Sequence, residues 1–313
     1  MLRSFVLLVL LYVFAPATFV NAQSWLASKP AGEKTIQISS VLTNDFLGDG
    51  KDRWKTGSLD VSLTFGGGDL RALPTKPWER YQLRVRSEII APANLTTPVI
   101  NDRQYVGVLG LGLFTHFETN GYDVTYGGEL VFVGENTGLG SLQKSIHEEL
   151  DFAAPSATVL NNQIANAIYP TVHAGVSKNL YGTKSLLRPF VEAQAGAETF
   201  LRVGADVIFG KAMMNDFLLR DSVSGQLISH SKADDSKGIG FLLGADAAYV
   251  VDSNYLPNSG VSKLEKFRPR ARAGVVYQAL KFDAFYGVTW LGKEFASQPE
   301  NQVVGSLNFR ISF

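Results

Sequence analysis

A short segment near the middle of the chain holds two polar side chains that could share one task. Its apolar residues recur at the spacing of one helical face: Leu139, Leu142, Ile146 and Leu150. Gln143 and His147 are four residues apart, so a helix places them one above the other beside that face. Histidine is the usual general base near neutral pH because it titrates there. The same residues also fit an ordinary surface helix with a polar edge.

An earlier segment is rich in oxygen atoms that could bind a cation. Residues 44–57 read Asn-Asp-Phe-Leu-Gly-Asp-Gly-Lys-Asp-Arg-Trp-Lys-Thr-Gly. Carboxylate and carbonyl oxygens suit a hard cation such as Ca²⁺, although no glutamate closes an EF-hand loop here. In alternating strands Asp45 and Thr56 face the polar side, whereas Asn44 needs a bulge to turn there. The alternative is a solvated turn in which Asp and Gly hold their usual positions.

The elements that must position these residues show a sequence period of two. From Gln302 to Phe313, apolar side chains alternate with mostly polar ones, which is typical of a strand. About twelve segments share the pattern: 34–45, 54–66, 78–91, 103–117, 122–134, 166–178, 186–197, 199–210, 237–251, 267–280, 281–292 and 302–313. An even number of strands near ten residues long predicts an all-β fold, a 12-stranded antiparallel transmembrane β-barrel.

The polar face of these strands carries charges of both signs. They include Arg84, Arg86, Arg202, Arg270, Arg272 and Arg310 with Asp60, Glu88, Asp123, Glu129, Glu192 and Asp206. Facing lipid, each arginine near the membrane midplane would cost about 2–4 kcal/mol, whereas opposite charges inside the barrel can pair. We therefore expect a filled lumen rather than a wide pore. The final Phe313 is the ending that bacterial barrel-assembly machinery usually receives.

The composition of the chain excludes several classes of protein. Among its 313 residues, 29 Lys and Arg balance 29 Asp and Glu, which excludes a generally basic nucleic-acid binder. The chain has no cysteine, which excludes disulfides, thiolate metal sites and a cysteine nucleophile. No interior apolar run reaches the length that a membrane-spanning helix needs.

The first residues have the pattern of a secretory signal. Arg3 precedes an apolar stretch over 5–14, and Val20-Asn21-Ala22 is a small-residue cleavage pattern. We therefore expect residues 1–22 to be a signal peptide and 23–313 to be an outer-membrane β-barrel of a Gram-negative bacterium. A periplasmic N-terminus then puts the helical segment in the extracellular loop between the fifth and sixth strands. The stretch 211–236 fits poorly, because it is long where a short periplasmic turn is expected.

Several motifs, in order along the chain, resemble the outer-membrane lipid A 3′-O-deacylases. They are Asn44-Asp45, Asp52-Arg53, Thr56-Gly57, residues 101–107 (Asn-Asp-Arg-Gln-Tyr-Val-Gly), Gly134, residues 143–147 (Gln-Lys-Ser-Ile-His), residues 161–164 (Asn-Asn-Gln-Ile) and Glu294-Phe295. Their order and spacing agree across nearly the whole mature chain. The resemblance implies a 12-stranded barrel and a calcium-dependent esterase that removes the 3′-linked acyloxyacyl chain of lipid A in the outer leaflet.

The resemblance also implies roles for individual residues. The family's catalytic histidine falls on His147, its polar partners on Gln143 and Thr56, and its metal-binding pair on Asn44 and Asp45. Arg103 is the basic residue expected to bind a lipid A phosphate. For the acidic residue that supports the site, the candidates are Glu148, Glu149 and Asp151. The expected partners are lipopolysaccharide, the outer membrane and the barrel-assembly machinery, and the barrel is expected to be a monomer.

These residues suggest a mechanism, and three rival functions stay open. His147 would deprotonate a water that attacks the ester carbonyl, and Ca²⁺ near Asp45 and Asn44 would stabilise the oxyanion. Gln143 and Thr56 would position substrate or water. The rivals are a serine-based outer-membrane phospholipase, a small porin or structural barrel, and a member of the same family that only binds lipopolysaccharide. For the other histidines we expect structural roles: His116, His173 and His230.

Overall fold

The computed structural model describes residues 35–66, 72–231, 237–256, 262–280 and 282–311. The predicted signal peptide lies outside the described residues. The long strands are β1 (Thr35–Asn44), β2 (Trp54–Gly66), β3 (Arg80–Ala91), β4 (Val106–Thr119), β5 (Tyr122–Val133), β6 (Ala167–Ser177), β8 (Ser185–Ala195), β9 (Glu198–Gly210), β12 (Gly238–Ser253), β13 (Phe267–Gln278), β14 (Phe282–Leu291) and β15 (Gln302–Ile311). The shorter elements are β7 (Leu180–Tyr181), β10 (Phe217–Arg220), β11 (Leu227–Ser231), η1 (Glu135–Thr137), α2 (Leu139–Glu149) and α3 (Ala157–Asn161). None of the helices in these ranges is long and apolar enough to cross a membrane.

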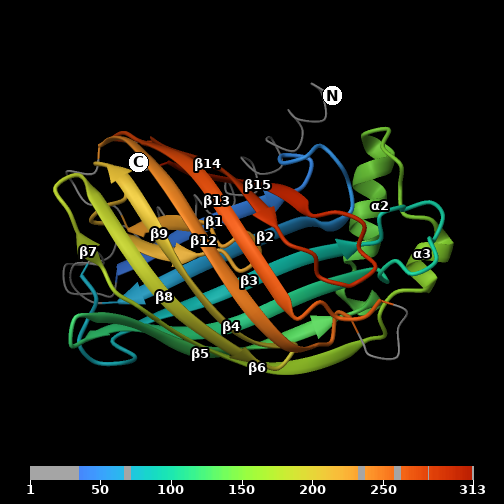
Figure 1. Cartoon of the computed structure of the whole chain (residues 1–313), viewed down its shortest axis with the longest axis horizontal. Helices are drawn as coiled ribbons and strands as arrows, with labels where there is room; N and C mark the ends of the chain where they lie inside the picture. Colours follow the sequence, from blue (N-terminus) through green and yellow to red (C-terminus); the bar gives the residue numbers. More distant parts are fainter. Residues whose placement is uncertain (1–34, 67–71, 232–236, 257–261, 281, 312–313) are drawn as a thin grey trace.

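The long strands close into a barrel (Figure 1). Each pairs antiparallel with its neighbours, and the ring is completed where β1 pairs with β15 and β6 pairs with β8. The predicted 12-stranded antiparallel barrel is therefore confirmed. Strand boundaries agree with the sequence prediction to within about three residues. The largest difference is at β4, which begins at Val106 because residues 103–105 belong to the preceding loop.

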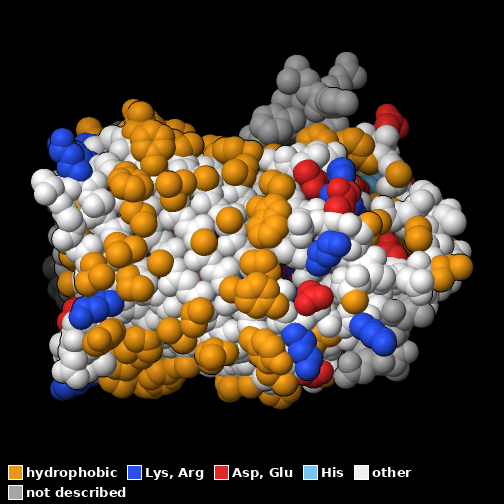
Figure 2. Space-filling model, in the orientation of Figure 1, with side chains coloured by type: hydrophobic (Ala, Val, Ile, Leu, Met, Phe, Trp, Pro, Cys, Tyr) orange, Lys and Arg blue, Asp and Glu red, His pale blue; other side chains and the backbone are white. Residues whose placement is uncertain are grey.

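Alternation along each strand separates a lipid-facing surface from a lumenal one. In β13, Arg268, Arg270 and Arg272 are buried, whereas Phe267 and Tyr277 are half-exposed or more. Hydrophobic side chains accordingly cover the strand region of the visible face, and most charged ones gather toward the end that carries α2 (Figure 2). The arginines point inward because a charge facing lipid has no counter-ion and loses its hydration.

The segment after β9 folds back into the barrel instead of forming a short turn. β10 and β11 pair as a hairpin, and its Leu218, Leu227 and Ile228 share a hydrophobic cluster with wall residues such as Leu186 and Leu242. Gln226 Nε2 donates hydrogen bonds to the carbonyl oxygens of the wall residues Ala273 (3.2 Å) and Val288 (3.1 Å). Gly225 at the tip has φ 73°, and a Cβ there would lie 2.8 Å from the Arg270 guanidinium carbon. The poor fit of 211–236 to a short periplasmic turn is therefore explained, because its described part folds into the lumen as a plug.

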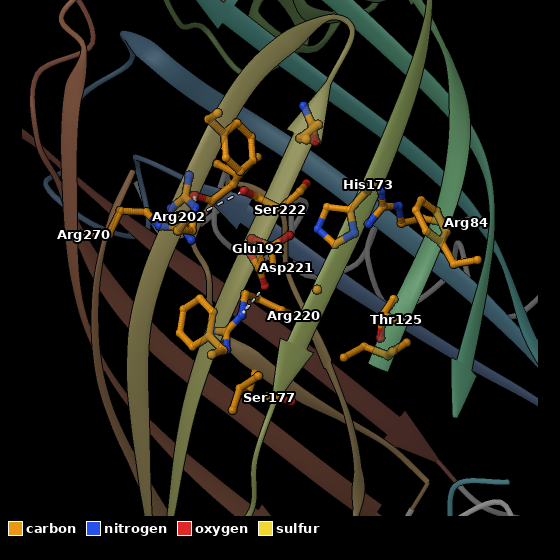
Figure 3. Close-up of a pocket in the computed structure, with 18 of the residues that line it drawn as sticks. Arg84, Thr125, His173, Ser177, Glu192, Arg202, Arg220, Asp221, Ser222 and Arg270 are labelled. Carbon is orange, nitrogen blue, oxygen red and sulfur yellow. Dashed lines mark hydrogen bonds and ion pairs between the residues drawn. The ribbon is translucent and has the colours of Figure 1, made fainter. Parts of the chain in front are cut away.

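Ion pairs attach this plug to the barrel wall. Arg220 of β10 pairs with Glu192 of β8 (Nε to Oε1, 2.9 Å) and with Asp206 of β9 (Nη2 to Oδ2, 2.7 Å). Arg220 points toward Glu192 within a cavity of about 200 Å³ that Asp221 also lines (Figure 3). The expected filling of the lumen by paired charges is present in the described strands, together with a hairpin that the sequence pattern did not predict.

The long loops and both α-helices meet at one end of the barrel, here called the outer end (Figure 1). Long loops are typical of the extracellular side of outer-membrane barrels, whose periplasmic turns are short. α2 lies between β5 and β6 in the chain, as predicted, and contacts β3 and β4. The outer end therefore combines the helix that carries His147 with the first hairpin that carries Asp45.

Candidate active site

Two glycines set the direction of α2. Gly134 and Gly138, on either side of η1, have φ values of 98° and 73°, which side chains other than glycine rarely adopt. The helix then buries Gly140, Gln143 and His147 against the barrel, while Leu142 is 51% exposed. The periodicity located the helix correctly, but the polar pair rather than the whole apolar face is turned inward. Gln143 and His147 therefore reach the interior of the outer end.

The loop after β1 is folded tightly around Asp45. The backbone carbonyl oxygen of Asp45 accepts hydrogen bonds from the backbone N–H groups of Gly48 (2.8 Å) and Gly50 (3.1 Å). Gly48 is required there, since a Cβ would lie 2.2 Å from the carbonyl oxygen of Val303. The pairing of β2 with β3 shifts register at Thr56, so the bulge is at Thr56 and not at Asn44. The result is that Asp45 and Thr56 are both buried at the outer end.

The carboxylate of Asp52 joins the hairpin to the helix. Thr56 Oγ1 donates a hydrogen bond to Asp52 Oδ1, and Gln143 Nε2 lies 3.4 Å from the same oxygen. His147 Nε2 lies 3.3 Å from Asp52 Oδ2. The three predicted catalytic residues, Thr56, Gln143 and His147, therefore meet on one side chain. Asp52 was not among the predicted site residues.

The other nitrogen of His147 is also held in place. Nδ1 donates to the carbonyl oxygen of Ala153 at 2.9 Å, and Phe152 packs edge-on against the ring with centroids 5.9 Å apart. Phe152 also contacts Phe46 of the first hairpin at 5.9 Å. These contacts fix the plane of the imidazole relative to the loop that carries Asp45 and Asp52.

The residues that follow His147 in the helix do not supply the acidic partner. Glu148 is 59% exposed in its side chain and lies 3.8 Å from Lys144, one turn back on the outer face of α2. In the described residues, the carboxylate that contacts His147 comes from Asp52, 95 positions earlier in the chain. Of the candidate acidic residues, Glu148, Glu149 and Asp151 are exposed, and Asp52 is the carboxylate in contact with His147.

Asp45 is a buried carboxylate with an unused oxygen. Its Oδ2 accepts the Arg53 backbone N–H at 2.7 Å, whereas Oδ1 has no hydrogen-bond partner among the described residues. Burial raises the pKa of Asp45 well above its usual range, and the neighbouring carboxylates of Asp52 and Asp49 raise it further. A site that gathers acidic groups and leaves one oxygen free is suited to a bound cation.

Calcium fits this site through oxygen atoms of several kinds. No group of three His, Asp or Glu side chains in the described ranges is arranged to hold a metal by itself. Ca²⁺ takes about six to eight oxygen ligands and also accepts amide and backbone carbonyl oxygens and water, so the free carboxylate oxygen of Asp45 would be one ligand among several. Asn44 Oδ1 accepts the backbone N–H of Phe46 at 2.8 Å and keeps a second lone pair. Asp45 is thus the stronger candidate ligand and Asn44 the weaker.

Arg103 is engaged away from this cluster. Its side chain is 1% exposed and pairs with Glu294, and Nη2 donates to the carbonyl oxygen of Tyr255 at 3.3 Å. Burial alone would raise the pKa of Glu294, but the nearby cations Lys55, Arg268 and Arg103 lower it well below its usual range. The structure therefore places Arg103 in a structural ion-pair group rather than beside His147.

Tyr105 is a further residue that the sequence analysis did not single out. It is 1% exposed, and its ring lies under α2, where a Cβ on Gly140 would be 3.6 Å from Tyr105 Cε1. Burial raises the pKa of Tyr105, and the carboxylate of Asp52 adds to the effect. Its hydroxyl and Gln143 Oε1 both lack a hydrogen-bond partner in the described part of the chain. Two unused polar atoms therefore lie beneath the helix beside Asp52.

A comparison with models of protein families supplies the classification. The model described as "Outer membrane protein LpxR" matches residues 5–313. The chain belongs to this family. Its barrel and its family membership together make it an outer-membrane protein. None of the curated proteins with which the chain was compared is similar enough to count as a relative.

Solved structures agree with this classification at the level of fold. LpxR from Salmonella typhimurium is 17% identical, with a TM-score of 0.72 over 89% of this chain and 100% of that one. The KdgM porin is 6% identical, with a TM-score of 0.39 over 89% of this chain and 99% of that one. The β domain of the Bordetella autotransporter BrkA is 10% identical, with a TM-score of 0.41 over the same two shares.

In this member of the LpxR family, the outer end can support hydrolysis. It brings together an oriented imidazole, a carboxylate that contacts the imidazole and a second carboxylate with a free oxygen. A base, an anionic partner and a cation ligand are the groups needed to activate water against an ester. The strands carry the wall and the loops carry the chemistry, which is the usual division in barrel proteins.

Proposed function

We propose that this protein is an outer-membrane esterase that hydrolyses the 3′-linked acyloxyacyl chain of lipid A. Membership of the LpxR family and the position of His147, Asp52 and Asp45 at the outer end support this proposal. Lipid A lies in the outer leaflet, where an outer-end site meets its sugar headgroup while the acyl chains stay in the bilayer. The observation that carries the proposal is the meeting of the helix and the first hairpin on Asp52.

His147 acts as the general base. A carbonyl oxygen only accepts hydrogen bonds, so the contact with Ala153 requires a proton on Nδ1 and leaves the lone pair on Nε2. Nε2 removes a proton from water as the water oxygen attacks the ester carbonyl carbon. When the tetrahedral intermediate collapses, the sugar oxygen leaves and takes the proton back from Nε2, so that a fatty acid and a free 3′ hydroxyl result.

Asp45 and Asn44 would hold Ca²⁺ in this proposal. A bound Ca²⁺ supplies positive charge that stabilises the oxyanion of an ester under attack. Asp45 contributes the free Oδ1, and burial keeps that oxygen away from bulk water. The chain's own part is to place the carboxylate, and the Arg53 N–H contact with Oδ2 both orients it and partly opposes the effect of burial on its ionisation.

The porin alternative is disfavoured by the lumenal plug. Leu218, Leu227 and Ile228 fill the barrel interior next to wall residues, and Arg220 is ion-paired across the gap. A serine-based phospholipase is likewise not favoured, since the imidazole of His147 contacts an aspartate and a backbone carbonyl. A member that only binds lipopolysaccharide would leave lipid A unchanged, which the experiment below detects.

Mass spectrometry of lipid A from cells with and without the protein tests the proposal. We expect loss of the 3′ acyl groups when the wild-type protein is present with Ca²⁺, and no loss with EDTA. His147→Ala should reduce hydrolysis by about 10²–10⁴-fold while the barrel still assembles. Lys144→Ala, on the exposed side of the same helix, is the matched control and should be fully active. Unchanged lipid A with wild-type protein, or full activity of His147→Ala, would contradict the proposal.

A further inference from the structure

We propose that Asp52 is the positioning residue of His147 and that Thr56 acts through Asp52 rather than on the substrate. This inference rests on the proposed hydrolysis and adds to it a chain of contacts running from β2 to α2. It differs from a reading in which Thr56 binds substrate directly. It also makes the loop between β1 and β2, rather than α2 itself, the source of the acidic partner.

The contacts of the imidazole determine which of its nitrogens carries the proton. Nδ1 is committed to the Ala153 carbonyl, so Nε2 is the basic nitrogen, and Nε2 is the atom that lies 3.3 Å from Asp52 Oδ2. A carboxylate and a nitrogen lone pair both only accept, so this contact becomes a hydrogen bond when Nε2 gains a proton. Asp52 therefore stabilises the positive charge that appears on the imidazole as water is deprotonated, while the Ala153 contact orients the ring.

The side chain of Asp52 is held in place by hydrogen-bond donors from β2 and α2. Its side chain is 36% exposed, so without other contacts it would be free to rotate away. Thr56 Oγ1 donates to Oδ1, and Gln143 Nε2 lies 3.4 Å from the same oxygen. These donors leave Oδ2 directed at His147. Asp52 is thus fixed from both elements that it joins.

The hydroxyl of Thr56 has no second proton to donate to a substrate. A threonine hydroxyl has a single proton, and Thr56 donates it to Asp52, although the hydroxyl also lies beside the carboxylate of Asp45. Thr56 is also buried at 3% exposure, on the bulge that turns it toward Asp52. Its effect on the reaction is therefore transmitted through the carboxylate.

Steady-state kinetics of the purified protein on bisphosphorylated lipid A in detergent micelles, at saturating Ca²⁺, test this relay. Asp52→Asn keeps the shape but loses the negative charge, and we expect kcat to fall about 10- to 100-fold with KM nearly unchanged. This loss is smaller than that of His147→Ala, because Asp52 is partly exposed to water. Glu148→Gln, which changes an exposed acid on α2, is the matched control and should retain full kcat.

A double-mutant cycle tests the route from Thr56. Thr56→Val alone should lower kcat several-fold, whereas adding Thr56→Val to Asp52→Asn should lower it little further, because the relay is already broken. Heat-modifiable migration of each variant confirms that the barrel has folded, and the isosteric Asp52→Asn guards against loss of folding. If Thr56 had a separate structural role, the losses of kcat in the two single variants would multiply in the double variant.

Three results would overturn the inference. The first is a multiplicative loss in the double variant, which would mean that Thr56 acts independently. The second is full kcat in Asp52→Asn. The third is complete recovery of kcat in Asp52→Asn when Ca²⁺ is raised above the concentration that saturates the wild type, which would make Asp52 a metal ligand instead. The proposed function fails by a different observation, namely full activity of His147→Ala, so the two failures are distinguishable.

Discussion

Asp45 shows how a single buried charge can be unfavourable for folding and useful for function. Burial, together with the carboxylates of Asp52 and Asp49, raises its pKa, so the ionised form is disfavoured in the folded protein. A raised folded-state pKa means that stability falls as pH rises through the acidic range, because ionisation is easier in the unfolded chain. A bound cation offsets this cost at neutral pH.

Asp45→Asn should therefore separate stability from activity. In EDTA at neutral pH we expect the variant to unfold at the same or a higher temperature than the wild type, since the buried charge is gone. This difference should shrink as the pH is lowered, because the wild-type carboxyl is then protonated. Hydrolysis should fall at least about 100-fold, and Ca²⁺ should no longer raise the unfolding temperature. A variant that is still stabilised by Ca²⁺ would show that Asp45 is not the ligand.

Tyr105 offers a second test at the scale of one atom. Its buried hydroxyl has no partner among the described residues, so removing it costs no hydrogen bond in the free protein. Tyr105→Phe should be at least as stable as the wild type. If the hydroxyl contacts bound lipid A beneath α2, kcat/KM should fall about tenfold in the micelle assay. Gln104→Ala, next to it in the loop, is a control, and equal activity of both variants would argue against such a contact.

The sequence indicated most single residues of the candidate site, but not how they are connected. Gln143 and His147 were identified by helical spacing and the motif resemblance, and both are buried as one pair. Asp52 was missed because the loop holds several carboxylates, and no spacing rule says which one faces a helix 91 residues later in the chain. Arg103 shows the reverse difficulty, since sequence reveals a charge but not the Glu294 that already neutralises it.

At the scale of elements, the loop between β14 and β15 joins several segments of the outer end through ion pairs of Glu294. Glu294 accepts contacts from Lys55 of β2 (3.5 Å), Arg268 of β13 (3.3 Å) and the buried Arg103. Three cations from separate segments thus converge on one carboxylate. Such buried pairs lose much stability when one partner is removed, because the remaining charges are left without compensation.

Glu294→Gln should consequently lower the free energy of unfolding by about 3–5 kcal/mol, measured by urea titration in micelles. Because the pKa of Glu294 is lowered in the folded state, this contribution is complete above the ordinary glutamate pKa of about 4.3 and disappears as the pH falls through the lower folded value. Glu300→Gln, in the same loop but 54% exposed, should change the free energy of unfolding far less, because water screens its ion pairs. Equal losses of unfolding free energy in the two variants would contradict the stabilising role of Glu294.

The elements themselves were predictable to different degrees. Long alternating strands repeat one signal along ten or more residues, so all twelve were located within a few residues. The hairpin of β10 and β11 was not, because strands of four and five residues give too short a pattern. Its placement depends on contacts with distant wall residues such as Leu186 and Phe285, which local sequence does not encode.

At the scale of the whole molecule, the two ends of the barrel have separate tasks. At the outer end, loops and helices surround His147 and Asp52. Toward the other end, a hydrophobic cluster and ion pairs seal the lumen around the hairpin. None of the contacts described for the hairpin reaches Asp52 or His147, so sealing and catalysis should be separable by mutation.

Deleting residues 217–231 tests this separation, since 211–216 and 232–237 remain as a connection between β9 and β12. The wild-type protein should show no single-channel conductance in planar bilayers, whereas the deletion should open a measurable pore through the barrel. Arg220→Gln is the matched control and should stay closed, because the apolar contacts of Leu218, Leu227 and Ile228 still hold the hairpin. Lipid A hydrolysis should persist in the open variant. A conducting wild-type protein would instead revive the porin alternative, and loss of hydrolysis on deletion would show that the plug supports the distant site.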